Sequence, residues 1–442
     1  MKKLFLIAAL FVAVASPAQP AADSAPWTLQ DCINYALEHN LSVQQSALRV
    51  EQREIELNTA RSSRLPGVSA GASQNFSFGR GLTEDNTYAN TNTTNTSFSL
   101  GADMPLFNGL RIQNNIALSR LNLQAATEDL EKARDDIRVA VAQAYVQILY
   151  KREILEVAHR QVEIDSLQVE RLEARHDNGK AAPADVAMQK ATLAQSRLAL
   201  VQASNSLQLA RLDLAQLLEL QSPESFDVAA PAIDRQHRLL PPSPESVYEE
   251  ALGIKPVVKA EETRLAYAER NISLAKGGYL PSLSLNGGLG TNYYTSSGYT
   301  SRNFFDQLGS NFSQYVGLSL NIPIFNRFST RNQVRIAKVN YNAQQLQLDQ
   351  TRKQLFKEIQ QAWYNAVAAV EKYESSLQAE TAAAESFALV QARYENGKAT
   401  ITEFNESKNQ YLKAGSDRVQ AHYESLYQAG LLDFYRGKDI EL

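Results

Sequence analysis

The chain has 442 residues, of which 21% are charged and 44% are hydrophobic, and these proportions exclude a disordered polypeptide. Its formal net charge is −4, and removal of Lys2 and Lys3 with a leader segment makes it −6, which argues against nucleic acid as a partner. No later segment has the roughly 18 consecutive apolar residues that a transmembrane helix needs, so this chain can cross a membrane only with strands.

Residues 1–22 have the anatomy of a signal peptide. Lys2 and Lys3 precede an apolar core of about a dozen residues, and small residues follow at Ala13, Ala15 and Ala18. Because the core is too short to span a bilayer as an anchor, we expect the segment to be removed and the mature protein to leave the cytosol.

The single cysteine, Cys32, cannot form a disulfide bond within the chain. The residues before it, from Leu29 to Asp31, lack the small side chains of a lipoprotein cleavage site. We therefore interpret Cys32 as a small buried residue of a helix.

The chain contains an internal duplication with an offset of 218 residues. Three pairs of segments share this offset: Pro105–Asn108 with Pro323–Asn326, Gln143–Ala144 with Gln361–Ala362, and Arg175–Ala181 with Arg393–Ala399. We expect one structural repeat over residues 23–220 and a second over residues 247–436. A proline-rich linker or equatorial segment, 221–246, separates them, and a short tail, 437–442, follows.

Each repeat is predicted to contain two strands, at 65–80 and 96–107 in the first copy and at 280–294 and 314–325 in the second. Apolar residues alternate with serine, asparagine and glycine, for example from Val68 to Phe78 and from Val316 to Ile324. Strands of about 10 residues cross a bilayer when tilted, and the polar alternate positions suit a water-filled lumen. The polar loops at 79–96 and 295–313 would then be extracellular.

The strands are followed by very long helices, at 110–177 and 328–395, which contain no proline or glycine. Each would be about 100 Å long at about 1.5 Å per residue. Apolar residues recur at spacings of three and four, as in Leu123, Ala126 and Leu130, so these helices are predicted to form coiled coils. Turns at 178–183 and 396–399 lead into helices 184–219 and 400–436, and shorter segments at 42–64 and 255–279 complete the helical layer.

Four amphipathic strands leave two open edges, which are costly in hydrocarbon, so a membrane sheet must close. Two chains would give about eight strands and a filled barrel, whereas three chains give about twelve strands and an open lumen. The predicted fold is mixed α and β: mostly a long α-helical coiled-coil barrel, with a four-strand contribution to a trimeric twelve-strand transmembrane β-barrel.

The duplication, the motifs Pro105–Gly109 and Pro323–Arg327, and the turn motifs Arg175–Val186 and Arg393–Phe404 together resemble the TolC-like outer-membrane efflux protein family. The resemblance covers nearly the whole mature chain. It implies a homotrimer in the outer membrane of a Gram-negative-type bacterium, with its helical part in the periplasm. It also implies a passive duct that exports solutes and docks onto a periplasmic adaptor (membrane fusion) protein and an inner-membrane transporter.

The resemblance places a gate just after the second turn. Glu403 and Glu406 match an acidic constriction, and being three residues apart they share one helical face. Tyr394 and Asp185 match a tyrosine-to-carboxylate link that holds the gate shut, although Ala399 stands where family members can carry an arginine. The alternative interpretation of the two glutamates is a solvated helix face.

The resemblance also assigns the two turns to adaptor contact. The residues concerned are Arg175, Asn178, Gly179, Lys180, Arg393, Asn396, Gly397 and Lys398. Turn chemistry without a partner explains the glycines equally well and the lysines less well.

Three other functions compete with an efflux duct. An enzyme is disfavoured because the five histidines lack metal-ligand spacing and no nucleophile elbow or phosphate-binding loop is present, so no catalytic residue, metal or cofactor is expected. A periplasmic structural coiled-coil protein would explain the helices but not four alternating strands. An adaptor protein would carry a compact β-rich domain that the sequence does not contain.

Overall fold

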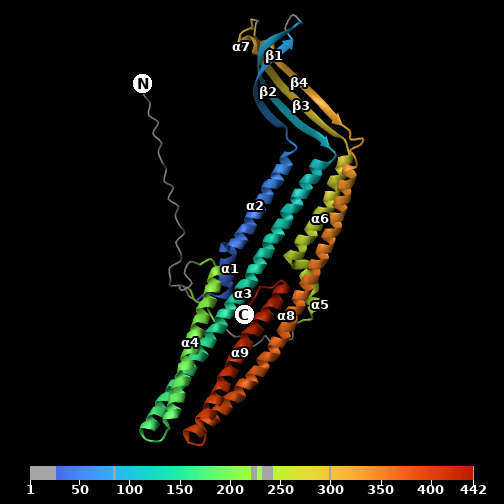
Figure 1. Cartoon of the computed structure of the whole chain (residues 1–442). Helices are drawn as coiled ribbons and strands as arrows, with labels where there is room; N and C mark the ends of the chain where they lie inside the picture. The colour runs from blue at the N-terminus through green and yellow to red at the C-terminus, as the bar shows by residue number, and fades with distance from the viewer. Residues whose placement is uncertain (1–25, 83–85, 221–225, 231–241, 298–299, 442) are drawn as a thin grey trace, which may run out of the picture.

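The computed structural model describes residues 26–82, 86–220, 226–230, 242–297 and 300–441, so the signal peptide expected over 1–22 lies outside the described residues. The described chain is elongated, with a four-stranded sheet at one end and helices along the rest (Figure 1). No helix within these ranges is both long enough and apolar enough to cross a membrane.

The first repeat begins with helices that have clear start signals. The Thr28 hydroxyl accepts a hydrogen bond from the Asp31 N–H at 3.2 Å, and the Asp31 carboxylate accepts one from the Thr28 N–H at 3.0 Å. This reciprocal pair is a capping box, which fixes the first turn of the first helix. The elements are α1 (Leu29–His39), α2 (Leu41–Ser62), β1 (Gly67–Leu82), β2 (Tyr88–Asn108), α3 (Arg111–Asp177) and α4 (Pro183–Leu217).

The second repeat consists of α5 (Pro244–Ile254), α6 (Pro256–Lys276), the short 3₁₀ turn η2 (Gly277–Tyr279), β3 (Ser282–Ser296), α7 (Phe304–Ser310), β4 (Ser313–Asn321), α8 (Ser329–Glu395) and α9 (Ile401–Tyr435). Its long helix α8 and its return helix α9 have 67 and 35 residues, the lengths of α3 and α4. The residue before each long helix is left-handed, with φ of 63° at Leu110 and 62° at Phe328. The two copies therefore share backbone geometry as well as sequence.

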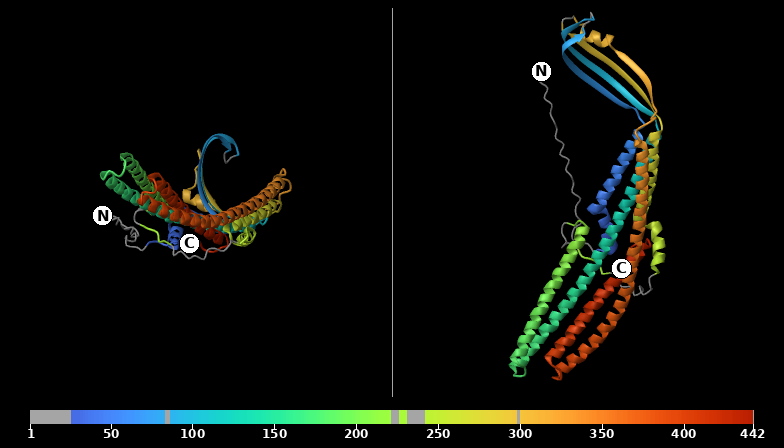
Figure 2. Two further views of the ribbon diagram at one scale, coloured as in Figure 1. Left: turned by 90° about the horizontal axis from the view of Figure 1, so that it is seen from below. Right: turned by 45° about the vertical axis from the view of Figure 1, so that its right-hand side comes forward.

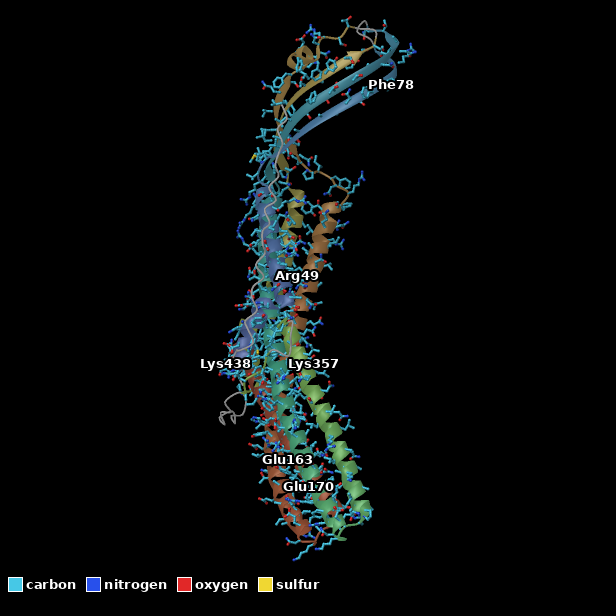
Figure 3. The ribbon with its side chains drawn as sticks, turned by 90° about the vertical axis from the view of Figure 1, so that its left-hand side faces the viewer. Arg49, Phe78, Glu163, Glu170, Lys357 and Lys438 are labelled. Carbon is cyan, nitrogen blue, oxygen red and sulfur yellow. The ribbon has the colours of Figure 1, made fainter. Side chains whose placement is uncertain are left out.

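The four strands form one antiparallel sheet in the order β1-β2-β3-β4, so β1 and β4 are its edges. Pairing of β2 with β3 joins the two repeats, and Leu100 lies opposite Leu289. Large apolar side chains of the edge strands, such as Phe78 at 77% and Val316 at 82%, are mostly exposed. Figure 3 shows Phe78 projecting from the sheet. Among the described elements, α7 packs against β3, and no other helix has more than a marginal contact with a strand, so no second layer covers most of the sheet.

β1 and β3 each begin and end two residues later than expected, and three further features differ from the sequence prediction. β2 begins at Tyr88 rather than at 96, because its Asn- and Thr-rich first half pairs with β1 although it has no apolar alternation. β4 ends at Asn321 rather than at 325, and Pro323 beyond it has no N–H to donate to a ladder. The helix α7 occupies part of the loop expected at 295–313, and its Gln307 side chain bonds the backbone of Tyr294 at 2.9 and 3.0 Å.

The helices form a single curved layer, visible end-on in Figure 2. Next to the sheet the order of contacts is α2, α3, α6, α8, and beyond the middle of the molecule it is α4, α3, α9, α8. The segments expected at 42–64 and 255–279 are α2 and α6. One lateral edge of the layer is therefore formed by α2 and α4 on the side of β1, and the other by α8 on the side of β4.

The largest apolar core lies at the middle of this layer, among α1, α3, α4 and α9. Ile148 and Leu149 of α3 are fully buried there, and so is Cys32, as interpreted from the sequence. The segment between the repeats contributes Val228, which forms a parallel bridge with Trp27. Its described residues therefore form an equatorial patch.

Candidate functional site

The two helical turns lie side by side at the end of the molecule opposite the sheet (Figure 1). Both turns have the same geometry. Gly179 and Gly397 are left-handed, with φ of 69° and 72°. The Asn178 and Asn396 side chains each donate to a backbone carbonyl four residues earlier, at 2.7 Å. Such bonds satisfy the free carbonyls of a helix end, which is why the Asn-Gly sequence ends both long helices.

The charged residues of the turns have two different environments. Lys180 and Lys398 are exposed, and no ion pair involving either is present among the described residues. Arg175 instead reaches the second hairpin, where Nη2 donates to the Glu395 carbonyl at 3.4 Å and the guanidinium lies 5.5 Å from the centre of the Tyr394 ring. Arg393 donates to the Lys398 carbonyl at 3.2 Å. The lysines are therefore the turn cations that are free to meet a partner.

Tyr394 is buried at 7% exposure, and its hydroxyl accepts a hydrogen bond from Gln168 Nε2 at 2.6 Å. Burial raises the pKa of Tyr394, and the neighbouring Arg175 opposes that shift. Asp185 lies near enough to add to the rise, but no hydrogen bond joins it to Tyr394 in the described chain. The link at this position is thus tyrosine to glutamine, between α8 and α3, rather than the tyrosine-to-carboxylate link inferred from the resemblance.

Glu403 and Glu406 occupy different environments although they share a face of α9. The Glu403 carboxylate accepts hydrogen bonds from the Thr400 N–H at 2.7 Å and from its hydroxyl at 3.0 Å, forming the capping box that starts α9. These bonds lower the pKa of Glu403, the backbone bond contributing most. Glu406 is exposed, has no ion-pair partner among the described residues, and lines a groove between α9 and α4 opposite Met188 and Thr192. Of the two, Glu406 is the residue whose carboxylate bonds no other described side chain.

A buried polar cluster lies behind this groove. Asp165 of α3 and Lys408 of α9 form an ion pair in which both side chains are 0% exposed. Gln189 of α4 donates to Asp165 at 3.2 Å, Ser196 also donates to Asp165, and Asn405 of α9 donates to Gln189 at 3.1 Å. Every described helix of this end except α8 therefore contributes to one hydrogen-bonded network.

This cluster was not predicted from the sequence, although the sequence contains a signal for it. Asp165 occurs in the same spacing of four and three as the buried Val169 and Leu172, and Lys408 follows the buried Phe404 by four residues. One acid and one base in the apolar stripes of two helices indicate a buried pair. Exposed charges such as Glu163 and Glu170 of α3, labelled in Figure 3, lie outside those stripes.

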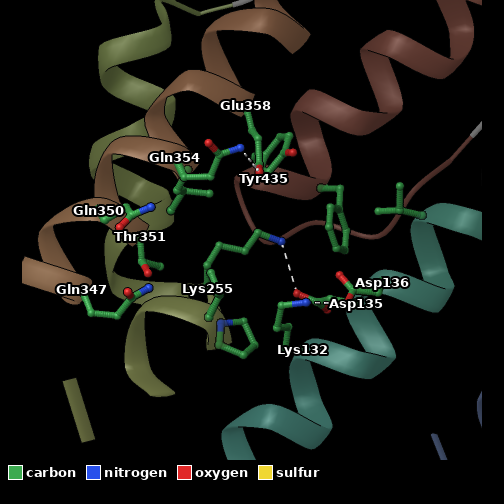
Figure 4. Close-up of a pocket in the computed structure, with 15 residues that line it drawn as sticks. Lys132, Asp135, Asp136, Lys255, Gln347, Gln350, Thr351, Gln354, Glu358 and Tyr435 are labelled. Carbon is green, nitrogen blue, oxygen red and sulfur yellow. Dashed lines mark hydrogen bonds and ion pairs between the residues drawn. The ribbon is translucent and has the colours of Figure 1, made fainter. Parts of the chain in front are cut away.

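A second polar cavity, of about 490 Å³, lies at the equator between α3, α6, α8 and α9 (Figure 4). Lys255 is 7% exposed, and its Nζ lies 3.4 Å from Asp135 Oδ2 and 3.4 Å from the centre of the Phe434 ring. Burial lowers the pKa of Lys255, and Asp135 opposes the shift. Because Lys255 contacts both a carboxylate and an aromatic face, it links the start of α6 to the end of α9.

Known proteins resemble this chain in sequence and in fold. The family model described as "Outer membrane efflux protein" matches residues 32–219 and 247–432, one segment in each repeat. The chain is 26% identical to protein CyaE of Bordetella pertussis, covering 92% of this chain and 83% of that protein. It is also 26% identical to the outer membrane protein TolC of Escherichia coli K12, with 84% and 74% covered.

Solved structures share the fold. The outer membrane protein VceC of Vibrio cholerae superposes with a TM-score of 0.77 at 20% identity, covering 93% of this chain and 97% of that one. The CmeC outer membrane channel of Campylobacter jejuni gives 0.79 at 17% identity, with 94% and 87% covered. The protein described here therefore belongs to the outer membrane efflux protein family, resides in the outer membrane with its helices in the periplasm, and serves as an efflux duct.

Proposed function

We propose that three copies of this chain form one continuous duct, a twelve-stranded barrel in the membrane joined to a helical tunnel. The observation that carries this proposal is the sheet itself, which has two unpaired edge strands and apolar side chains exposed along them. Unpaired backbone groups cost several kcal/mol each in hydrocarbon, so β1 of one copy must pair with β4 of the next. Three copies give about twelve strands, enough to leave an open lumen.

The helical layer supports the same head-to-tail arrangement. On the α2 edge, Leu41, Leu48 and Ile55 recur every seven residues and are 55–63% exposed. On the opposite edge, α8 exposes Val339 and Leu346, again seven residues apart, at 65% and 71%. Seven-residue apolar repeats bury one helix against another, so these two edges are complementary when copies close into a ring.

The periplasmic end of the duct is proposed to be its gate. In a trimer, Glu406 from each copy would bring three carboxylates near the axis, and a ring of like charge attracts cations. The Gln168–Tyr394 hydrogen bond and the contact of Arg175 with Glu395 would hold the two hairpins of each copy together. Opening then requires those contacts to change, with no chemical reaction and no cofactor.

The tips are proposed to dock onto a periplasmic adaptor that connects the duct to an inner-membrane transporter. Support comes from Lys180 and Lys398, which are exposed at equivalent positions of the two turns and whose side-chain amines form no ion pair among the described residues. Two equivalent turns in each of three copies would present about six similar sites, which suits a ring of adaptor subunits.

Channel recordings test the gate. Purified protein in a planar lipid bilayer should conduct, and a multivalent cation added on the periplasmic side should block the current. Glu406→Gln should weaken that block at least tenfold, because it removes the exposed carboxylates of the ring. Glu163→Gln, an exposed substitution on α3, is the matched control and should leave the block unchanged. Equal block in Glu406→Gln and the native protein would remove Glu406 from the gate.

A further inference from the structure

The Asp165–Lys408 cluster joins the two hairpins of one copy. Asp165 and Gln189 belong to the α3–α4 hairpin, whereas Asn405 and Lys408 belong to α9. Gln189 is 0% exposed, and its side chain bonds both Asp165 and Asn405, so the hydrogen bonds pass from one hairpin to the other and back. This is the only ion pair of the described residues in which both side chains are fully buried.

The two repeats differ at this point. The offset of 218 residues pairs Lys408 with Lys190, but it pairs Asp165 with Ala383. Without a matching buried acid, Lys190 lies at the surface, where it pairs with Glu173 of the same hairpin at 2.7 Å and is 57% exposed. A lysine in equivalent sequence context is therefore solvated in one copy and buried in the other. The burial of Lys408 is not a property of the repeat, and it depends on Asp165.

A buried ion pair has an unusual effect on two packed helices. It fixes their register, because a shifted helix leaves a charge buried without a partner. It contributes little net stability, because both ions lose their hydration on burial. When such helices separate, water reaches both ions and their hydration is restored. Separation is then less costly than it would be for a well-packed apolar contact of the same size.

We propose that Asp165 and Lys408 form a releasable joint, which holds the two periplasmic hairpins in register and lets them part at low cost. The joint predicts opposite effects on hairpin separation for single and for double substitutions. Loss of one partner alone leaves a buried charge that drives the hairpins apart. Replacement of both partners by apolar residues of similar size removes the charges and holds the hairpins together more tightly.

Hydrogen exchange on the full-length detergent-purified protein tests the joint. Exchange would be followed by mass spectrometry in segments 161–170 of α3 and 404–412 of α9. Lys408→Met should speed exchange in both segments at least tenfold relative to the native protein. The double substitution Asp165→Leu with Lys408→Met should slow it below the native rate. Lys190→Met, which removes the equivalent exposed lysine, is the control and should leave both segments unchanged.

The joint is refuted by native exchange rates in Lys408→Met, or by a double variant that exchanges as fast as the single one. Should Lys408→Met not yield folded protein, slower exchange in the double variant than in the native protein supports the joint, and equal or faster exchange refutes it. The consequence for transport rests on the proposed gate, so conductance is measured in parallel. Exchange that follows the predicted order while conductance stays constant upholds the joint and refutes a gate at this end.

Discussion

Tyr394 is the residue whose hydroxyl joins the two periplasmic hairpins through Gln168. Tyr394→Phe keeps the ring and its packing but leaves the buried Gln168 amide, 2% exposed, without this acceptor. An unsatisfied buried donor costs about 1–3 kcal/mol, so the midpoint of helix melting should fall. Circular dichroism of the purified protein measures it. Tyr364 is 65% exposed and its hydroxyl bonds no described residue, so Tyr364→Phe should leave the midpoint unchanged. Equal midpoints would contradict the role given to Tyr394.

The contacts of individual side chains are also the feature that the sequence predicts least well. The family resemblance assigned Tyr394, Glu403 and Glu406 to a gate, the two glutamates by counting from Gly397, but it did not show which groups Tyr394 and Glu403 bond. Gln168 lies 226 positions from Tyr394 in the sequence. Thr400 is only three positions from Glu403, and their capping box is a pattern that the sequence does contain. Buried partners across two hairpins are set by tertiary packing, which periodicity along one helix does not encode.

At the scale of elements, the turn glycines show how the chain fixes the ends of its helices. Gly397 has φ of 72°, and a Cβ there would meet no atom within 4 Å, so only backbone strain opposes a side chain. Gly397→Ala should destabilise the α8–α9 hairpin by about 1–2 kcal/mol. Gly253 of α5 also has open space but no positive φ, so Gly253→Ala should stabilise the protein by about 0.4–1 kcal/mol. Opposite shifts in thermal midpoint are expected, and shifts of the same sign would contradict this account.

The two long helices could be predicted because their sequence patterns extend over many residues. The absence of proline and glycine over 110–177 and 328–395 placed the ends of α3 and α8 within one residue. Elements defined by pairing partners could not be predicted as well. The first half of β2 has no apolar alternation and is held by its ladder with β1, and α7 is a single short helix whose Gln307 side chain bonds the backbone at Tyr294. Local sequence carries little information about either interaction.

At the scale of the whole molecule, one copy is a curved layer with two uncovered lateral edges. Its curved helical layer has apolar stripes on both lateral edges, and its sheet has unpaired edges on the same two sides. Family membership accounts for the outer-membrane location and the efflux role, whereas the proposed closure of copies into a ring is inferred from these exposed edges. The two edges differ from each other, so in the proposed ring each copy would meet the next head to tail, and the curvature of one copy would set the number of copies.

The most direct measurement is the mass of the particle extracted from the outer membrane in mild detergent, determined by native mass spectrometry. The account predicts a particle of three chains, since four strands per copy leave an open lumen only when about twelve are joined. Leu48→Lys together with Leu346→Lys, one charge on each lateral edge, should reduce that species in favour of single chains. A native particle that contains one chain would contradict the account, because a lone copy leaves both edges of its sheet unpaired in the membrane.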